Sequence, residues 1–420
     1  MAETKRRIFF WMRAAISVVA AAIVLAAVGV GLRYWITSDG GRAFLVSQID
    51  GRKIGPLGVI RVSGLKGDPL KAATLADIAL VDDDGVWLRA HDAKIAWTPF
   101  KLFAGNLEIA SVDVRDIDVQ RRPHSTEKSK NNGAPDIGIK LDSLTIHEIK
   151  LADGVLGPAA SFSIDGAGAR AKDGSGFGRL TMAPLAGPGD RLQANAEWSA
   201  KGALTGQVNA MGPAGGAFAT LLLAPDDATV TLDAHLAGTL AEFTGDARLS
   251  FSGTPIVTLD ASRKGDDAKL NLMLAADRWM ILEPVAGFTG GAVTIAATAQ
   301  LADLKRAPVS VVLTAPAGEI DASTLVNIDE TKLAGPLQLN GRKLDLARFA
   351  DGLGGRLDAT GVARINRPSS WSWQGDAAVA DLVFPGGAAK TAAGPITVGM
   401  SGNAVTWEGA KLAVAGGRIS

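Results

Sequence analysis

The sequence predicts a mostly β protein, with an N-terminal transmembrane helix followed by an elongated, curved antiparallel β-sheet and a few short helices. Three observations predict this class. A strand pattern with one apolar face occurs twice, short alternating strands fill the second half, and an uncharged run follows a basic N-terminus. Alternation with a period of two is typical of strands that bury one face.

The repeated pattern is I-A-S-V-D-V-R-D-I-D-V at Ile109–Val119 and L-D-S-L-T-I-H-E-I-K-L at Leu141–Leu151. Apolar residues alternate in both copies, except for one step of three residues in each. One extra residue in a strand forms a bulge, which bends the strand and returns the apolar residues to the same face. The apolar positions that the pattern predicts on one face are Val112, Val114, Ile117, Val119, Leu144, Ile146, Ile149 and Leu151.

The second half contains many short alternating segments, such as Leu270-Leu272-Leu274 and Val309-Val311-Leu313. Turn signals such as Gly265-Asp266-Asp267 separate them. Polar residues occupy the intervening positions, which indicates antiparallel strands with one apolar and one solvated face. The spacing is irregular, so a solenoid of fixed period is excluded.

Local signals place the turns and short helices. Asp82-Asp83-Asp84-Gly85 separates two apolar strands and predicts a hairpin turn. The acidic triplet lacks the spaced ligands of a calcium loop, so we interpret it as a solvated turn. Ser38 or Asp39 can cap a short helix, and further helices are expected at Ala214–Leu223 and Asp345–Leu353.

Composition argues against several functions. Lys and Arg together number 43, as do Asp and Glu, so no basic surface favours nucleic acid as a partner. The chain has no cysteine, which excludes disulfides and thiolate metal sites, and it has only four histidines. His147 and Glu148 lie within one strand and point to opposite faces, so His147 is interpreted as a structural or surface residue. We predict no enzyme and assign no catalytic, cofactor-binding or metal residues.

The N-terminus predicts a single-pass membrane anchor. Residues 1–13 are basic and are expected to be cytoplasmic, and residues 14–35 form the anchor. The uncharged run Ala14–Leu32 would span roughly 28 Å as a helix, close to the thickness of a hydrocarbon core. A cleaved signal peptide, with a poor cleavage site at Ala27-Val28-Gly29, is the alternative. The residues expected at the membrane interface are Arg13, Arg33, Tyr34 and Trp35.

The rest of the chain is predicted to be periplasmic and to comprise a first β region at 36–123, a flexible loop at 124–135 and an extended β region at 136–420. The last stretch, Lys411–Ser420, alternates as a strand with no closing element. An extended sheet needs a capped end, so the chain is expected to be a fragment truncated at its C-terminus.

Several segments resemble the N-terminal part of the TamB family of AsmA-like proteins. They are G-L-K-G-D-P-L at Gly64–Leu70, D-D-G-V-W-L-R-A at Asp83–Ala90, I-A-W-T-P-F-K-L-F at Ile95–Phe103, D-V-Q-R-R-P at Asp118–Pro123 and, more weakly, Leu344–Leu357. The resemblance implies an inner-membrane anchor and a long, hollow periplasmic β-structure. It also implies an outer-membrane β-barrel partner of the TamA type, phospholipid transfer to the outer membrane and outer-membrane protein assembly.

The apolar faces allow two interpretations. They can pack together as a closed core, or they can line a U-shaped groove that holds the acyl chains of phospholipids. Inward positions are mostly Ala, Val or Leu and aromatic residues are scarce, which suits an unfilled channel. With the resemblance, this favours a groove lined near the anchor by the apolar residues of the repeated pattern. The alternative function is a chaperone-like module that presents sheet edges to outer-membrane β-barrel or autotransporter substrates. A surface adhesin is disfavoured by the uncleaved anchor.

Overall fold

The computed structural model describes residues 39–124, 137–348, 351–367, 370–401, 404–408, 413–415 and 418–419. The predicted anchor at 14–35 and its interface residues Arg13, Arg33, Tyr34 and Trp35 lie outside the described residues, as does nearly all of the predicted loop at 124–135. In the described part of the chain, no helix combines the length and the apolar character that crossing a membrane requires.

The described chain is mostly β and divides into two compact units. Unit 1 comprises Met1–His235 and Phe251–Gly253, and unit 2 comprises Leu236–Ser250 and Thr254–Ser420. The predicted loop at 124–135 therefore falls inside unit 1.

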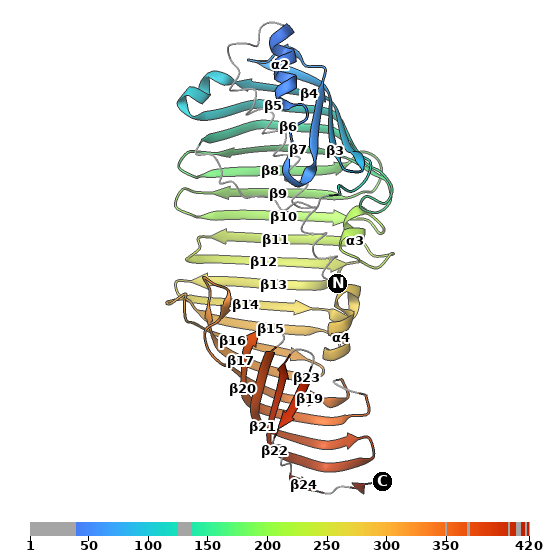
Figure 1. The fold of residues 1–420 in the computed structure, drawn as a ribbon, viewed down its shortest axis with the longest axis vertical. Coiled ribbons are helices and arrows are strands. Elements are labelled where there is room, and N and C mark those ends of the chain that lie inside the picture. Colours follow the sequence, from blue (N-terminus) through green and yellow to red (C-terminus); the bar gives the residue numbers. More distant parts are fainter. Residues whose placement is uncertain are drawn as a thin grey trace. The chain divides into compact units, whose positions relative to one another are not determined.

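Unit 1 begins with a helix and a 3-10 turn and continues almost entirely in strands (Figure 1). Its elements, the last of which crosses the unit boundary, are α2 (Asp39–Ile49), η1 (Gly55–Leu57), β1 (Val59–Ser63), β2 (Lys66–Asp68), β3 (Ala72–Asp82), β4 (Gly85–Thr98), η2 (Pro99–Ala104), β5 (Asn106–Val119), β6 (Gly138–Leu151), β7 (Ala160–Arg170), β8 (Gly176–Pro184), β9 (Arg191–Trp198), β10 (Leu204–Gly212), α3 (Ala217–Leu221) and β11 (Val230–Gly238).

Most neighbouring strands of unit 1 are antiparallel, as predicted. The short strands β1 and β2 both pair with β3, and β3, β4 and β5 follow as antiparallel neighbours. The predicted hairpin is confirmed, since Asp82 ends β3 opposite Gly85. The pair β5–β6 is parallel and corrects the expectation of a wholly antiparallel sheet. Residues 120–137 connect these two strands, and this connection is long enough for the crossover that a parallel pair requires.

The hydrophobic core of unit 1 is formed by β1 and β3 to β6 with η1. Trp87 is 1% exposed, and its indole Nε1 donates to the carbonyl of Leu57 at 2.9 Å. Helix α2 contributes Val46 and Ile49, which pack against this core. The predicted short helix is thus confirmed and packs against the core, while its predicted cap at Ser38 or Asp39 stays a prediction.

Unit 2 is a series of antiparallel strands with short helical segments between some of them. Its elements, of which the first crosses the boundary, are β12 (Glu242–Phe251), β13 (Thr254–Lys264), β14 (Asp267–Leu274), η3 (Ala276–Arg278), η4 (Met280–Leu282), α4 (Glu283–Thr289), β15 (Val293–Gln300), β16 (Ala307–Ala315), β17 (Gly318–Asn327), β18 (Lys332–Leu333), β19 (Leu337–Asp345), η5 (Leu346–Arg348), β20 (Gly354–Arg367), β21 (Ser370–Phe384), β22 (Gly387–Ser401), β23 (Ala404–Glu408), β24 (Ala413–Ala415) and β25 (Arg418–Ile419).

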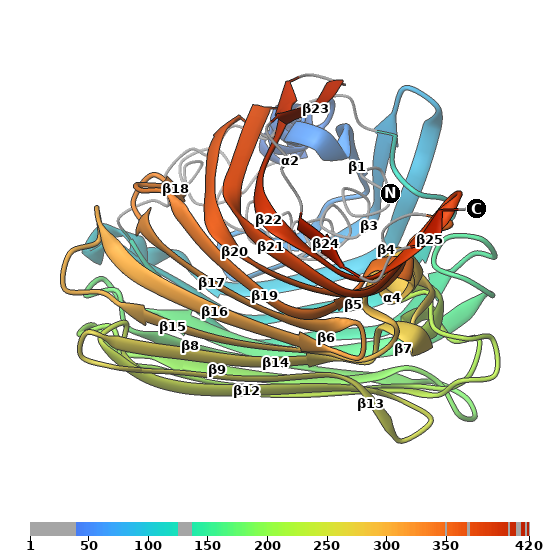
Figure 2. The same ribbon diagram turned by 90° about the horizontal axis from the view of Figure 1, so that it is seen from below.

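The long strands β20, β21 and β22 are strongly curved (Figure 2). The helix expected at Asp345–Leu353 is wrong, because Asp345 ends β19 opposite Arg356 and, of the residues described in this segment, only Leu346–Arg348 form a 3-10 turn. Strand pairing across Leu344 and Leu357 overrides the local helical preference there.

Candidate functional site

The two copies of the repeated pattern lie side by side as β5 and β6. Their parallel register joins equivalent residues, so Val114 is opposite Ile146 and Ile117 is opposite Ile149. The predicted bulge is confirmed in the second copy, since the register of β6 with β7 shifts between Ile146 and Ile149. In the first copy the register of β5 with β4 shifts between Ser111 and Ile109, and it does not shift at the predicted step from Val114 to Ile117.

These apolar side chains are buried. The exposed fractions of Val112, Val114, Ile117, Val119, Leu144, Ile146, Ile149 and Leu151 lie between 2% and 8%, and all of them belong to the core of unit 1. The structure therefore brings the predicted groove residues together on one face, in a packed core that also contains residues of η1 and β1. Lipid contact at these positions stays a prediction.

The opposite side of β4, β5 and β6 carries a layer of ion pairs. His91 Nδ1 lies 2.6 Å from Asp116 Oδ2, and Arg115 Nε donates to Asp116 Oδ1 at 2.6 Å. Burial opposes ionisation of Asp116, but the hydrogen bonds from Arg115 and His91 outweigh it and lower the pKa of this carboxyl. His147 Nε2 lies 3.1 Å from Asp113 Oδ2 on the same side.

One group of potential metal ligands occurs in the part of the chain that the structure describes: His91, Asp116 and Asp118, whose ligand atoms lie within 4.8 Å of one another. Both oxygens of Asp116 already accept hydrogen bonds from protein side chains. Asp118 Oδ1 lies 3.9 Å from the Lys150 ammonium. The protein's own cations thus occupy the place that a metal ion would take.

Asp82 of the acidic turn holds the hairpin to the end of β5. Arg121 donates to both of its carboxylate oxygens, and the backbone N–H groups of Asp84 and His124 donate to it at 3.0 and 2.7 Å. The hydrogen bond from Arg121 lowers the pKa of Asp82 to about 2, against the opposing effect of burial. The turn is therefore tied to a guanidinium at Asp82 and offers no free carboxylate there.

The apolar face of β5 and β6 continues across the rest of unit 1 in a regular row of cross-strand partners. One such row consists of Val114, Ile146, Ile164, Met182, Leu192 and Ala210. Beyond β6 most members of these rows are only partly buried, as at Ile164 and Leu192. The apolar face of unit 1 is thus less completely buried beyond β6 than at β5 and β6.

Unit 2 has an apolar face of the same kind. One row of partners runs through Leu259, Leu272, Ile295, Leu313 and Ile320. A second row runs through Ala261, Leu270, Ala297, Val311, Ala322 and Leu339. Every residue of both rows is partly exposed. We call this surface the apolar face of unit 2.

The helical segments of unit 2 mainly contact one another and β20. Helix α4 packs against η3, η4 and η5, and η5 packs against β20. The large residues that are fully buried, such as Ile256 and Val293, lie near strand ends. Periodicity in the sequence predicted which residues share a face here, but it carries no information on whether the face is covered.

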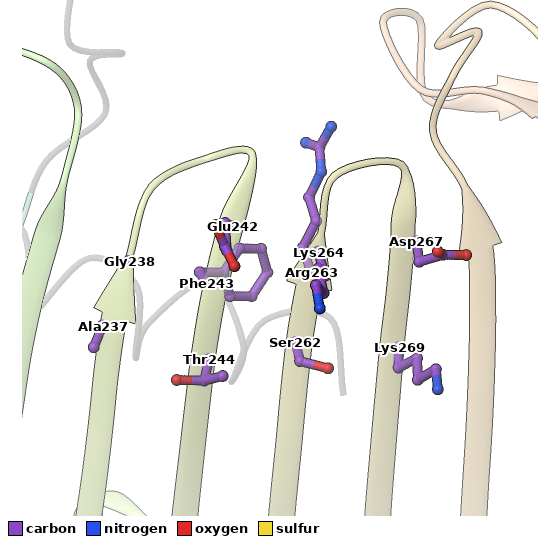
Figure 3. A pocket seen from close by; sticks show the side chains of 10 residues that line it. All are labelled: Ala237, Gly238, Glu242, Phe243, Thr244, Ser262, Arg263, Lys264, Asp267 and Lys269. Carbon is purple, nitrogen blue, oxygen red and sulfur yellow. The ribbon is translucent and has the colours of Figure 1, made fainter.

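An open pocket of about 680 Å³ lies at the ends of β11 to β14 in unit 2 (Figure 3). Arg263, Lys264 and Lys269 contribute positive charge to its lining, and Glu242 and Asp267 contribute negative charge. The charges nearly balance, so the pocket has no strong preference for an anion or a cation.

No protein-family model, no curated protein and no solved structure matches this chain. The family assignment drawn from the TamB-like segments accordingly stays a prediction.

Proposed function

We propose that the chain binds the acyl chains of phospholipids along the apolar face of unit 2 and passes them between membranes. The observation that carries this proposal is the row of large aliphatic side chains, such as Leu272 and Leu313, that stay partly exposed. Each CH₂ group that such a face removes from water gains about 0.8 kcal/mol. A folded chain that leaves this surface open forgoes that gain unless a ligand covers it.

The face of a sheet suits an acyl chain better than a polypeptide. The backbone groups of β13 to β17 are already paired with one another within the sheet. A peptide laid across the face would leave its own N–H and C=O groups without partners, which costs roughly 1–3 kcal/mol for each group. An acyl chain has no such groups, so it is the occupant that the face favours.

The alternative function requires strand addition at a sheet edge, but few backbone groups of β1 are unpaired. The backbone of Ile60 already exchanges hydrogen bonds with Gly51 and Arg52, and the N–H of Val62 donates to Asp50. An edge strand offers a template for another chain only where such groups are unpaired. At this edge of the sheet, the pairing leaves few backbone groups for an added substrate strand.

In this proposal the protein is an inner-membrane-anchored periplasmic conduit that acts with an outer-membrane β-barrel of the TamA type. Residues 14–35 supply the anchor. The apolar residues around Val114 and Ile146 belong to the packed core of unit 1. Transfer requires no tight complex, because acyl chains gain about as much on the protein as in a bilayer.

Photocrosslinking in cells tests the proposal. A photoreactive residue at Leu272 or Val311 should capture phospholipid, and one at Asn271 should not. Asn271 is the matched control, because it neighbours Leu272 on β14 and points to the opposite, exposed face. Equal lipid capture at Leu272 and Asn271, or none at Leu272 in a folded protein, would contradict the proposal. Capture of β-barrel precursors at Leu272 would favour the chaperone function instead.

A further inference from the structure

The polar face of unit 2, opposite the apolar face, contains an open hollow of about 480 Å³ over β16, β17, β19 and β20. Three adjacent rows of cross-strand partners line it. The two outer rows, whose side chains share the polar face, are Ser310, Ser323, Gln338 and Val362, and Val312, Asp321, Asn340 and Thr360. The row between them, which forms the floor of the hollow, is Val311, Ala322, Leu339 and Gly361. Hydroxyl and amide groups from four adjacent strands thus converge on one place.

The hollow differs from the rest of the polar face. Thr294 and Thr298 on β15 are exposed, as expected for the solvated side of a sheet. Ser323, Asn340 and Asp321 are partly buried, although they lie on the same side, and Ser310, Gln338 and Thr360 are exposed at the border of the hollow. A bulge in β19 between Gly341 and Leu344 accompanies this change, and bulges bend the strands that contain them.

Several polar groups in the hollow are available to a ligand. In the described ranges, the side chains of Ser310, Ser323 and Gln338 have no hydrogen-bond partner, whereas Thr360 donates to Asn340 at 3.1 Å. Serine hydroxyls and glutamine amides can each donate and accept. The free groups therefore match a ligand whose own groups both donate and accept.

The electrostatics of the hollow exclude a strongly charged ligand. Asp321 is the one charged residue among those that line it, and Arg342 forms an ion pair with it. Val312 and Val362 add apolar contact area beside the polar groups. A neutral molecule with many hydroxyl groups and apolar C–H faces combines these properties, and the volume of the hollow lies in the usual range for ligand pockets.

We propose that this hollow is a binding site for a neutral saccharide. The site lies on the face opposite the proposed lipid-binding surface, so it is independent of that function. Gln338, Ser323 and Ser310 would bond to sugar hydroxyls, and Val312 and Val362 would contact the ring.

Calorimetric titration of the full chain with chitotriose and with maltotriose tests the proposal, with inorganic phosphate as the charged comparison. At least one saccharide should bind, and phosphate should not. Gln338→Ala should weaken binding about fivefold to tenfold, because it removes hydrogen bonds from an exposed side chain that the fold does not need. Ser323→Leu, which fills the hollow, should abolish binding.

Thr298→Ala is the matched control, since Thr298 is the partner of Ser310 in the same row and lies outside the hollow. It should leave the affinity unchanged, and circular dichroism should show the fold intact in every variant compared. The proposal is overturned if neither saccharide binds. It is also overturned if the Gln338→Ala and Ser323→Leu variants both bind the saccharide as strongly as the wild type. Lipid capture at Leu272 should be the same in all three variants, which separates this site from the proposed conduit.

Discussion

Two apolar faces built on the same strand pattern have different environments in this protein. In unit 1, the face of β5 and β6 belongs to a core that also contains residues of η1 and β1 and against which α2 packs, and Ile109 is completely buried. In unit 2, the corresponding side chains, such as Leu272 and Val311, remain partly exposed. The alternation of residues is similar, so the covering elements make the difference. A strand pattern predicts which residues share a face of the sheet. Whether that face is buried depends on the segments that pack against it.

The largest expected effect comes from placing a charge on each face. Ile146→Glu puts a carboxylate where the native side chain is 4% exposed, at a cost of several kcal/mol, and should prevent unit 1 from folding. Leu272→Glu lies on the open face and should leave the fold intact while abolishing lipid capture at Val311. Circular dichroism and urea denaturation measure the first effect. Two variants that fold equally well would show that the two faces do not differ.

Truncating a leucine on each face sharpens the comparison. Leu144→Ala leaves a cavity in the core of unit 1 and should cost about 3 kcal/mol of unfolding free energy. Leu272→Ala removes a partly exposed side chain and should cost about 1 kcal/mol. Urea denaturation of the two variants provides the measurement. A loss at Leu272 as large as that at Leu144 would mean that the face of unit 2 is also covered.

The ion pair between Asp82 and Arg121 should make unit 1 sensitive to acid. The pKa of Asp82 is about 2 in the folded chain, against an ordinary value of 3.8. A lowered carboxyl pKa stabilises the fold above the unfolded value, and this contribution disappears as the pH falls from about 4 to 2. The contribution is about 2 kcal/mol, because a tenfold change in the acid dissociation constant corresponds to roughly 1.4 kcal/mol.

The pH dependence of unfolding in wild type and in Asp82→Asn tests this prediction. The variant should be less stable at neutral pH, and the two proteins should converge near pH 2. Asp83→Asn is the control, because this exposed turn residue should change stability by less than about 0.5 kcal/mol. A constant difference between wild type and Asp82→Asn across this pH range would contradict the assignment.

The smallest expected effect concerns the short helices of the two units. Asp190 caps α3, since its carboxylate accepts the N–H groups of Ala217 and Phe218 at 2.8 and 3.0 Å. No side chain caps α4 at Leu282. Asp190→Ala should therefore destabilise α3 by about 1 kcal/mol and bring its amide hydrogen exchange closer to that of α4. Unchanged exchange in α3 would show that packing alone holds this helix.

Much of the fold follows from the sequence because strand alternation and turn chemistry are local signals. The hairpin at Asp82–Gly85 and the bulge between Ile146 and Ile149 both come from spacing of a few residues. The parallel pairing of β5 with β6 could not be predicted in this way. It depends on contacts between segments that are far apart in the chain, and the similarity of the two copies does not specify whether they pair.

The candidate site was less accessible to prediction for a related reason. Val114 and Ile146 were expected to line an open groove, and periodicity correctly places them on one face with the rest of their set. Burial depends on the whole core, which is drawn from several strands and from η1, and most of these segments lie elsewhere in the sequence. The hydroxyl and amide groups of the saccharide hollow come from separate strands, so no short pattern in the sequence indicates that they converge.

The parallel pairing of β5 and β6 also has a consequence for how the chain tolerates changes in length. The register of a hairpin such as β3–β4 depends on its turn, and one added residue there would turn a strand's side chains to the wrong face. The register of β5–β6 depends on side-chain packing between Val119 and Leu151 and their neighbours. Lengthening a loop costs little conformational entropy, so insertions and fusions are best placed in the crossover between these two strands.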